Sequence, residues 1–274
     1  MTYQDFRFAV KLANTVNWNM VEEDFVFMKT IEPEGCFVLY EKSNPIGIAT
    51  CVNHKTLGWF GNLIIEEKYR NQGAGGFLVK HAIKYLCAKG IETVGLYAYP
   101  HLIDFYRNFG FEVDEDFVYL KANNIHLKSH PQIKMIDDKD LGNLAKFDAN
   151  YFGGDRERIF QKVLIEKKGM GCFVAEKNVV IGLIIAKIFD SVAEVGPLVC
   201  AYNREDVTLQ LIDGLLVKIS KNTDIYLCLP KKHEKIINHL EATGFREEFC
   251  VTRMFLEKKS LKNCVYFAES LERG

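Results

Sequence analysis

The feature that most constrains the fold is an internal repeat with a nearly constant offset. The tetrapeptide GCFV at residues 35–38 recurs at residues 171–174, an offset of 136. Three later landmarks recur in the same order, at offsets of 135, 135 and 134: Ile46-Gly47 with Ile181-Gly182, Gly61-Asn62-Leu63-Ile64 with Gly196-Pro197-Leu198-Val199, and Phe109-Gly110-Phe111 with Thr243-Gly244-Phe245. Solenoid repeats are much shorter, so this pattern predicts two diverged copies of one domain plan.

The join between the copies is expected in residues 122–133, a polar stretch that contains a proline and no long apolar periodicity. We place it close to Ser129, which gives a first half of residues 1–128 and a second half of residues 129–274. A chain of 274 residues with 48% apolar side chains is long enough for two ordinary domains, each with a full core.

The charge balance argues against several kinds of partner. With 35 basic and 36 acidic side chains, the chain lacks the basic surface that binds nucleic acid or an anionic membrane. No apolar run is long enough to span a bilayer, and the first residues do not resemble a secretory signal. The eight cysteines include no CxxC pair, so we expect reduced thiols, no metal site and a cytoplasmic location.

Within the first half, apolar periodicity and turn residues predict strands that alternate with helices. The pattern favours a mixed α/β (α+β) sheet. The predicted helices are residues 3–13, 21–30, 77–88 and 102–109, and the predicted strands are residues 36–40, 45–54, 58–65, 93–99 and 111–120.

A glycine-rich turn, RNQGAGG at residues 70–76, joins the third of these strands to a helix. Glycines let a ligand approach the backbone, and a helix start offers unpaired N–H groups and the positive end of the dipole. Together they can hold a phosphate. The turn lacks the Gly-Lys-Ser/Thr of a P-loop and the GxGxxG of a dinucleotide site. A purely structural helix entry is the alternative.

The stretch LIIEEKYRNQGAGG, residues 63–76, resembles the cofactor motif of the GNAT superfamily of N-acetyltransferases. Arg70, Gly73 and Gly75 occupy the family's signature, Arg/Gln-x-x-Gly-x-Gly/Ala. The segment FYRNFGF at residues 105–111 resembles the short helix and Gly-Phe ending of that family. The resemblance covers residues 1–127. It implies two tandem GNAT-like domains, each a mostly antiparallel, splayed sheet flanked by helices.

The resemblance also implies acetyl-CoA as the co-substrate. Its pyrophosphate would lie on the N–H groups of residues 71–76, and its pantetheine arm would pair with the strand backbone as an added strand. A main-chain N–H would stabilise the oxyanion that develops on the thioester. The implied cofactor-binding residues are Leu63, Ile64, Ile65, Arg70, Asn71, Gln72, Gly73, Ala74, Gly75 and Gly76.

Acetyl transfer to an amine also requires proton transfers. Tyr106 matches the tyrosine that commonly donates a proton to the CoA sulfur in this family; packing on a short helix is its alternative role. The sequence identifies no general base. Glu66 and Glu67 follow the cofactor strand, where a solvated strand end is the favoured alternative. His54 and His101 lie at strand ends, where a surface or turn position is favoured. A water relay is a further possibility.

One residue departs from the family pattern. Tyr99 stands where family members often carry an Asn that contacts CoA.

Two other features resemble a class of two-domain GNAT proteins: Trp18-Asn19 and residues 148–156, DANYFGGDR. In that arrangement Asp148 and Arg156 would face the acceptor, and their alternative is an internal ion pair. Trp18 would be a lid or a core aromatic.

The second half has lost the chemistry of the first. An offset of 135 places Thr208 and Gln210 where the first half has Gly73 and Gly75, and an offset of 134 places Leu240 opposite the tyrosine. We therefore expect a degenerate copy that does not bind acetyl-CoA in the usual way and that shapes the acceptor site.

The sequence thus predicts an N-acetyltransferase that moves an acetyl group from acetyl-CoA to a primary amine of a small molecule. One alternative is a non-catalytic CoA-binding sensor or assembly module. Another is an enzyme in which both halves bind CoA. The acceptor's identity, the preferred acyl chain and the oligomeric state stay open.

Overall fold

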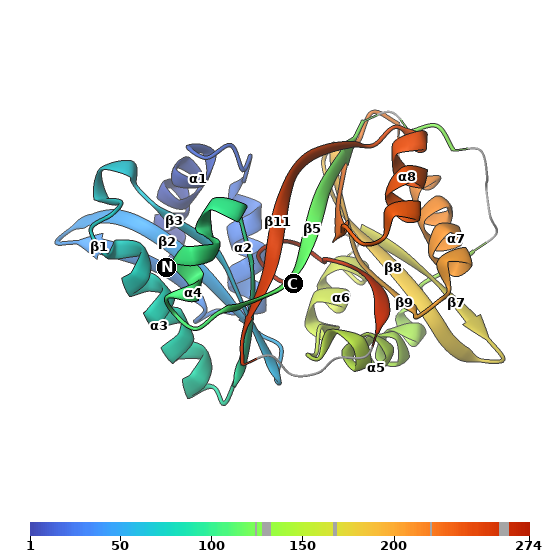
Figure 1. Ribbon diagram of the computed structural model, residues 1–274, viewed down its shortest axis with the longest axis horizontal. Coiled ribbons are helices and arrows are strands. Elements are labelled where there is room, and N and C mark those ends of the chain that lie inside the picture. The colour runs from blue at the N-terminus through green and yellow to red at the C-terminus, as the bar shows by residue number, and fades with distance from the viewer. Residues whose placement is uncertain (124, 128–132, 167–168, 220, 258–262) are drawn as a thin grey trace.

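The computed structural model describes residues 1–123, 125–127, 133–166, 169–219, 221–257 and 263–274. The predicted join at Ser129 lies outside the described residues, so the domain boundary stays a prediction. The described strands form one mixed sheet of twelve strands, flanked by helices on both sides (Figure 1). This confirms the predicted fold class.

The first half contributes five strands and four α-helices among the described residues. Their order follows the prediction, and 3-10 turns precede α1, α3 and α4. The elements are α1 (Phe6–Asn14), α2 (Glu22–Ile31), β1 (Cys36–Glu41), β2 (Asn44–Asn53), β3 (Leu57–Ile65), α3 (Ala74–Ala88), β4 (Thr93–Ala98), α4 (Ile103–Arg107) and β5 (Glu112–Ala122).

The second half repeats this plan with one additional strand at each end. Its elements are β6 (Lys134–Met135), α5 (Leu141–Phe152), α6 (Glu157–Leu164), β7 (Gly169–Glu176), β8 (Val179–Phe189), β9 (Val192–Ala201), α7 (Glu205–Leu216), β10 (Asp224–Pro230), α8 (Glu234–Thr243), β11 (Arg246–Leu256) and β12 (Cys264–Phe267).

The two halves exchange their last long strands. The sheet order is β1-β2-β3-β4-β11-β5-β10-β9-β8-β7-β6, with β12 on β9. Strand β11 of the second half pairs with β4, and β5 of the first half pairs with β10. These two long strands run through the middle of the molecule in Figure 1. Backbone hydrogen bonds therefore hold the halves together, and the sequence pattern did not reveal this exchange.

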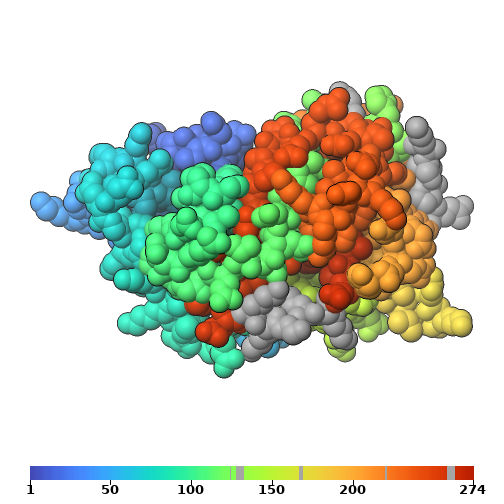
Figure 2. Space-filling model, viewed as in Figure 1, coloured from blue at the N-terminus to red at the C-terminus, as the bar shows by residue number. Residues whose placement is uncertain are grey.

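Apolar packing also crosses between the halves. Helix α3 covers one face of β2 and β3, whereas α7 and α8 cover the equivalent face of the second half. A third cluster combines Phe27 and Met28 of α2 with Leu144 of α5 and Phe160 of α6. On the face in Figure 2, green atoms of the first half touch orange atoms of the second. No helix in the described part of the chain has both the length and the apolar character needed to cross a membrane.

Each half contains one pair of parallel strands that diverge along their length. Strands β3 and β4 pair only where residues 57–59 face residues 93–95. Strands β9 and β10 pair where residues 192–195 face residues 224–227. Beyond these ladders the strands separate, and the predicted splay is confirmed. The two splayed pairs differ in one respect: β12 pairs with residues 198–201 of β9, whereas the corresponding edge of β3 has no such partner strand among the described residues.

Candidate functional site

The predicted cofactor strand presents backbone rather than side chains at the opening between β3 and β4. The side chains of Ile64 and Ile65 are buried in two different apolar clusters, on opposite faces of the sheet. On its other edge the strand pairs with β2 through these same two residues. The edge toward β4 has no ladder beyond Trp59 in the described chain. That edge can receive an extended ligand by strand-like hydrogen bonding.

The glycine turn leads directly into α3. Gly73 has a φ of 86°, in the left-handed region that favours glycine, and Asn71 has a φ of 59°. The first hydrogen bond of the helix runs from the N–H of Phe77 to the carbonyl of Gly73, at 2.9 Å. The N–H groups of residues 74–76 therefore have no partner within the helix, and no side chain caps them. The helix starts three residues before the predicted Phe77, because its first turn tolerates two glycines.

Two polar side chains of the turn hold the loop in shape. Arg70 donates from Nε to the carbonyl of Ile65 at 3.0 Å, and Gln72 donates to the carbonyl of Lys68 at 2.8 Å. A Cβ atom at Gly73 would meet nothing within 4 Å, so the space outside the turn is open. Open space, unpartnered N–H groups and the positive end of a helix fit the pyrophosphate of acetyl-CoA.

A cavity of about 650 Å³ lies between the two halves at the opening of the splay. Its walls include Leu63 and Tyr106 from the first half and Lys187, Glu194 and Phe249 from the second. A ligand on the β3 edge would therefore reach a space that both halves line. The predicted cofactor strand and the second half therefore border one space.

Tyr106 lines this cavity and is only 6% exposed. Its ring packs edge to face against Phe60, Phe105 and Phe111, with centroids 5.0 to 6.3 Å apart. Burial raises the pKa of Tyr106, so the phenol keeps its proton at neutral pH. The packing role and the proton-donor role are thus compatible, and the latter stays a prediction.

None of the four residues considered as bases lines the cavity. His54 is 1% exposed, and its ring nitrogens lie 3.2 and 2.9 Å from the main-chain oxygens of Asp155 and Arg273. Burial, with the positive charge of Arg156, lowers the pKa of His54 to about 3. His54 thus serves the contact between the halves. Among the described residues, no group of three or more His, Cys, Asp or Glu side chains is arranged to hold a metal ion.

Trp18 lies in the cavity wall, as one of its two predicted roles requires. Its indole Nε1 donates to the hydroxyl of Tyr99 at 3.1 Å, and Tyr99 also lines the cavity. Trp18 also packs against the apolar cluster of α1 and α2, so both of its predicted roles stay open, and Tyr99, the residue that departs from the family pattern, holds its indole in place.

Asp148 and Arg156 adopt the alternative that the sequence left open. Both are 0% exposed, neither lines the cavity, and Arg156 binds the Asp148 carboxylate through two hydrogen bonds of 2.6 and 3.0 Å. Arg156 also donates to the hydroxyl of Tyr266 and to the main-chain oxygen of Gly274. The pair therefore fixes the segment after β12, and the suggestion that it faces the acceptor is wrong.

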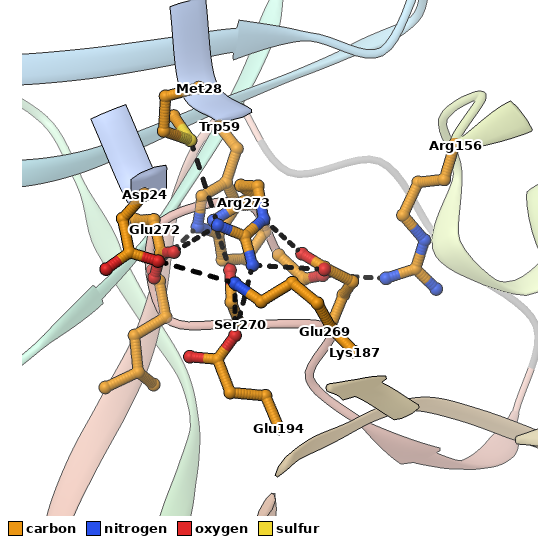
Figure 3. A network of polar contacts seen from close by, with 12 residues as sticks. Asp24, Met28, Trp59, Arg156, Lys187, Glu194, Glu269, Ser270, Glu272 and Arg273 are labelled. Atoms are coloured by element: carbon orange, nitrogen blue, oxygen red, sulfur yellow. Dashed lines mark hydrogen bonds and ion pairs between the residues drawn. The ribbon is translucent and has the colours of Figure 1, made fainter. Parts of the chain in front are cut away.

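Sequence reasoning missed the charged residues of that segment. Glu269 and Glu272 line the cavity, and Arg273 lies between them (Figure 3). The segment follows the last repeated landmark and has no counterpart in the first half, so the offset could not align it. The available signal was two glutamates and an arginine, residues 269, 272 and 273, directly after the apolar run VYFA.

The comparisons with known proteins agree with this geometry. Two family models, each described as an acetyltransferase (GNAT) domain, match residues 32–113 and 144–265. A GCN5-related N-acetyltransferase from Arabidopsis thaliana, described as chloroplastic, is 31% identical over 72 residues, 26% of this chain. The match covers only 28% of that relative's length.

Two solved structures share the fold over nearly the whole chain. A putative acetyltransferase from Pyrococcus horikoshii superposes with a TM-score of 0.82 at 17% identity, covering 100% of this chain and 94% of that one. A tandem GNAT protein from the clavulanic acid biosynthesis pathway superposes with a TM-score of 0.64 at 11% identity, covering 94% and 96%. At these identities the likeness concerns the fold.

Proposed function

Because the chain belongs to the GNAT acetyltransferase family as a tandem protein with two such domains, we propose that its first half is an N-acetyltransferase. It would move an acetyl group from acetyl-CoA to a primary amine of a small molecule. The observation that carries this proposal is the open edge of β3 beyond Trp59, which leads to an uncapped, glycine-led helix start.

The proposed cofactor contacts come mainly from the backbone. The N–H groups of residues 74–76 would bind the pyrophosphate, with Gly73 and Asn71 shaping the turn. The main chain of residues 63–65 would pair with the pantetheine arm. When bound, acetyl-CoA supplies an acetyl group activated as a thioester. A main-chain N–H on this strand would stabilise the charge that develops on the carbonyl oxygen.

Tyr106 is proposed as the acid. It carries its proton at neutral pH because burial raises its pKa, and it borders the cavity where the sulfur would depart. A phenol that protonates the departing thiolate lowers the cost of breaking the C–S bond. The retained tyrosine favours an enzyme over a non-catalytic CoA-binding module.

The cavity supports a small acceptor. Both halves line its volume of about 650 Å³, which is the size range of small-molecule sites. The second half would thus shape the acceptor site without binding a cofactor. All eight cysteines are free thiols, which is consistent with a reducing compartment such as the cytoplasm.

The test is a calorimetric titration of acetyl-CoA into the protein and into the Gly75→Glu variant. We expect one acetyl-CoA per chain for the unchanged protein. A carboxylate in the first turn of α3 would repel the phosphates, so affinity should fall by about tenfold or more, which is 1.4 kcal/mol or more. A Cβ at position 75 makes only ordinary contact, 3.5 Å from the Phe105 ring, so the variant should fold.

Gly142→Glu provides a matched control. Gly142 is likewise the second residue of a helix, α5, and a Cβ there meets nothing within 4 Å. Its affinity for acetyl-CoA should equal that of the unchanged protein. Equal loss in both variants, or binding that survives Gly75→Glu, would contradict the proposed cofactor site. Two acetyl-CoA per chain would instead support the enzyme with two sites.

A further inference from the structure

A partly buried cluster of charges, with Lys187, Glu269 and Arg273 at its buried centre, borders the cavity beside the cofactor strand (Figure 3). Arg273 binds Glu269 through hydrogen bonds of 2.7 and 3.1 Å and also contacts Glu272. Its guanidinium lies 3.5 Å from Glu194, and Lys187 Nζ lies 2.6 Å from the same Glu194 oxygen. Strand β8, strand β9 and the segment after β12 thus contribute to one network.

The negative charges of this network outnumber the positive ones. Asp24 of α2 lies 3.7 Å from Lys187 and adds a fourth carboxylate. Four carboxylates against Lys187 and Arg273 give a formal charge of −2. Burying a charge without a partner costs several kcal/mol. The cluster is therefore arranged to accept a further positive charge, and every member except Arg273 lines the cavity.

Asn62 provides a second, independent indication of a ligand. It lines the same cavity, it is 8% exposed, and its Nδ2 has no hydrogen-bond partner among the described residues. Its φ of 51° marks a local irregularity of β3, immediately before Leu63. A buried amide without a partner costs about 1–3 kcal/mol. Because Nδ2 is a donor, only an acceptor atom would remove that cost; a protonated alkyl diamine offers none, whereas an oxygen of acetyl-CoA on the adjacent edge of β3 would.

Aromatic rings also line the cavity. Phe249 stacks on Tyr119 with centroids 4.6 Å apart, and Tyr226 lies 5.8 Å from Tyr119. Trp18 and Tyr99 line it as well. The faces of such rings attract cations, and their bodies bury alkyl chains. Together with the acidic cluster, they match a cationic group on an alkyl chain.

We propose that the acceptor enters this cavity as an alkylammonium cation without a carboxylate, of the diamine class, and that Glu272 binds the ammonium and takes its proton. This inference rests on the proposed function, because it names the acceptor class of the same site. Within the predicted class of small-molecule primary amines, it separates alkyl diamines from amino acids.

The position of Glu272 suits that role. A Cβ atom at Gly61 would lie 2.6 Å from Cα of Glu272, so this residue packs directly on β3, two positions before Leu63. Burial raises the pKa of Glu272, which brings the carboxyl closer to the proton affinity of an amine. In the transfer, one N–H bond of the ammonium breaks and one O–H bond forms on Glu272. The amine keeps the electron pair for attack, and solvent later removes the proton from the acid.

The groups that face Glu272 set its titration. Its own segment provides Arg273, which favours its ionised form, and Glu269, which opposes it. Lys187 of β8 favours the ionised form as well, whereas Glu194 of β9 opposes it. Although burial opposes the ionisation of Glu194, the charges of Lys187 and Arg273 lower the pKa of that carboxyl. Glu194 therefore stays ionised while Glu272 exchanges its proton.

The direct test is binding, measured without turnover. Two ligands are titrated into the CoA-saturated protein by calorimetry: hexamethylenediamine and ε-aminocaproate. They have the same number of carbons, and the second carries a carboxylate where the first carries an ammonium-bearing carbon. We expect the diamine to bind at least about tenfold more tightly. Glu272→Gln should weaken diamine binding by about tenfold, and Glu272→Asp should restore part of it. Glu241→Gln, an exposed site on α8, should change neither ligand's affinity.

The second readout is the pH profile of kcat/KM with the diamine. The fall of kcat/KM at low pH should reflect protonation of Glu272, and it should be absent in Glu272→Gln. The affinity of that variant for acetyl-CoA should stay unchanged. Equal binding of the two ligands, binding of neither, or a fall at low pH that survives the substitution would overturn this inference. The proposed function fails separately, through loss of acetyl-CoA binding in the titration of the unchanged protein. Thermal unfolding of each variant checks that it is folded.

Discussion

The two halves share one fold but differ at the opening between their two parallel strands, which is free in the first half and filled by a strand in the second. In the first half, the edge of β3 at residues 63–65 is free on the side toward β4. In the second half, the offset of 135 makes residues 198–200 of β9 the equivalent edge, and there the chain pairs with itself. Residues 265–267 of β12 form an antiparallel ladder with them. The position proposed for a pantetheine arm in one half holds a strand of the same chain in the other.

The connections after these strands differ as well. Eight residues, 66–73, join β3 to α3, whereas three residues, 202–204, join β9 to α7. The shorter connection removes the glycine turn, as the sequence predicted. Acidic residues Glu205 and Asp206 occupy the first turn of α7, and Arg204 pairs with Asp206 at 2.9 Å. A phosphate there would meet negative charge instead of free N–H groups.

The comparison shows that the scaffold alone does not decide what a half can bind. Both halves keep the diverging parallel pair and the helix that follows it. A free strand edge and the length of one connection separate them, and each is a local property that mutation can change. The expectation that the second half is degenerate thus has a structural explanation in β12 and residues 202–204.

The largest expected effect tests how β12 is held in place. Asp148→Asn leaves the buried Arg156 guanidinium without its ionic partner, and Arg156 holds Tyr266 of β12 and the main chain of Gly274. We expect the free energy of unfolding to fall by about 3–5 kcal/mol, measured by urea denaturation. Lys235→Ala, which removes an exposed pair on the same half, should cost less than about 1 kcal/mol. Similar losses in the two variants would mean that the buried Asp148–Arg156 pair does not hold β12 in its place on β9.

The next effect concerns catalysis in the open half. Tyr106→Phe should lower kcat about 100-fold, close to 2.7 kcal/mol, without changing the affinity for acetyl-CoA. The matched control is Tyr202→Phe, an exposed tyrosine in the short connection of the second half, which should leave kcat unchanged. Unchanged turnover in Tyr106→Phe would refute the acid role. Binding of acetyl-CoA without turnover of any amine by the unchanged protein would favour the CoA-binding module.

Local features of the fold could be predicted from the sequence because neighbouring residues determine them. The succession of helices and strands along the first half follows from apolar periodicity, and the turn at residues 70–76 follows from its glycines. The start of α3 was placed too late, because Gly75 and Gly76 resemble a turn although they form its first helical turn.

Long-range pairing could not be read in the same way. Val118 of β5 pairs with both Leu229 of β10 and Cys250 of β11, and an apolar strand of this kind fits either a partner from its own half or one from the other. Glu272 was missed for a related reason. Two of the charges that act on it, Lys187 and Glu194, lie far away in sequence, so no local motif marks it.

A smaller effect tests the contact between the halves at His54. Burial and the charge of Arg156 lower its pKa from 6.5 to about 3, so the unfolded chain takes the proton first as the pH falls. Stability is therefore complete above about pH 6.5 and is lost toward pH 3, by up to about 1.4 kcal/mol per pH unit. Urea midpoints between pH 7 and 5 should fall less steeply in His54→Gln. Identical slopes would show that protonation of His54 does not drive the loss.

The smallest effect tests whether the left-handed glycine of the turn contributes to the difference between the halves, beside β12 and the short connection. Gly73→Ala should cost about 1 kcal/mol, because its φ of 86° is strained for alanine although the added Cβ meets nothing within 4 Å. Gly142→Ala, in a helix with ordinary φ, should stabilise by about 0.5–1 kcal/mol. Both values come from urea denaturation. If Gly73→Ala is as well tolerated as Gly142→Ala, the turn does not depend on its left-handed glycine. The loss of glycines would then not explain the second half, and β12 with the short connection would account for the whole difference.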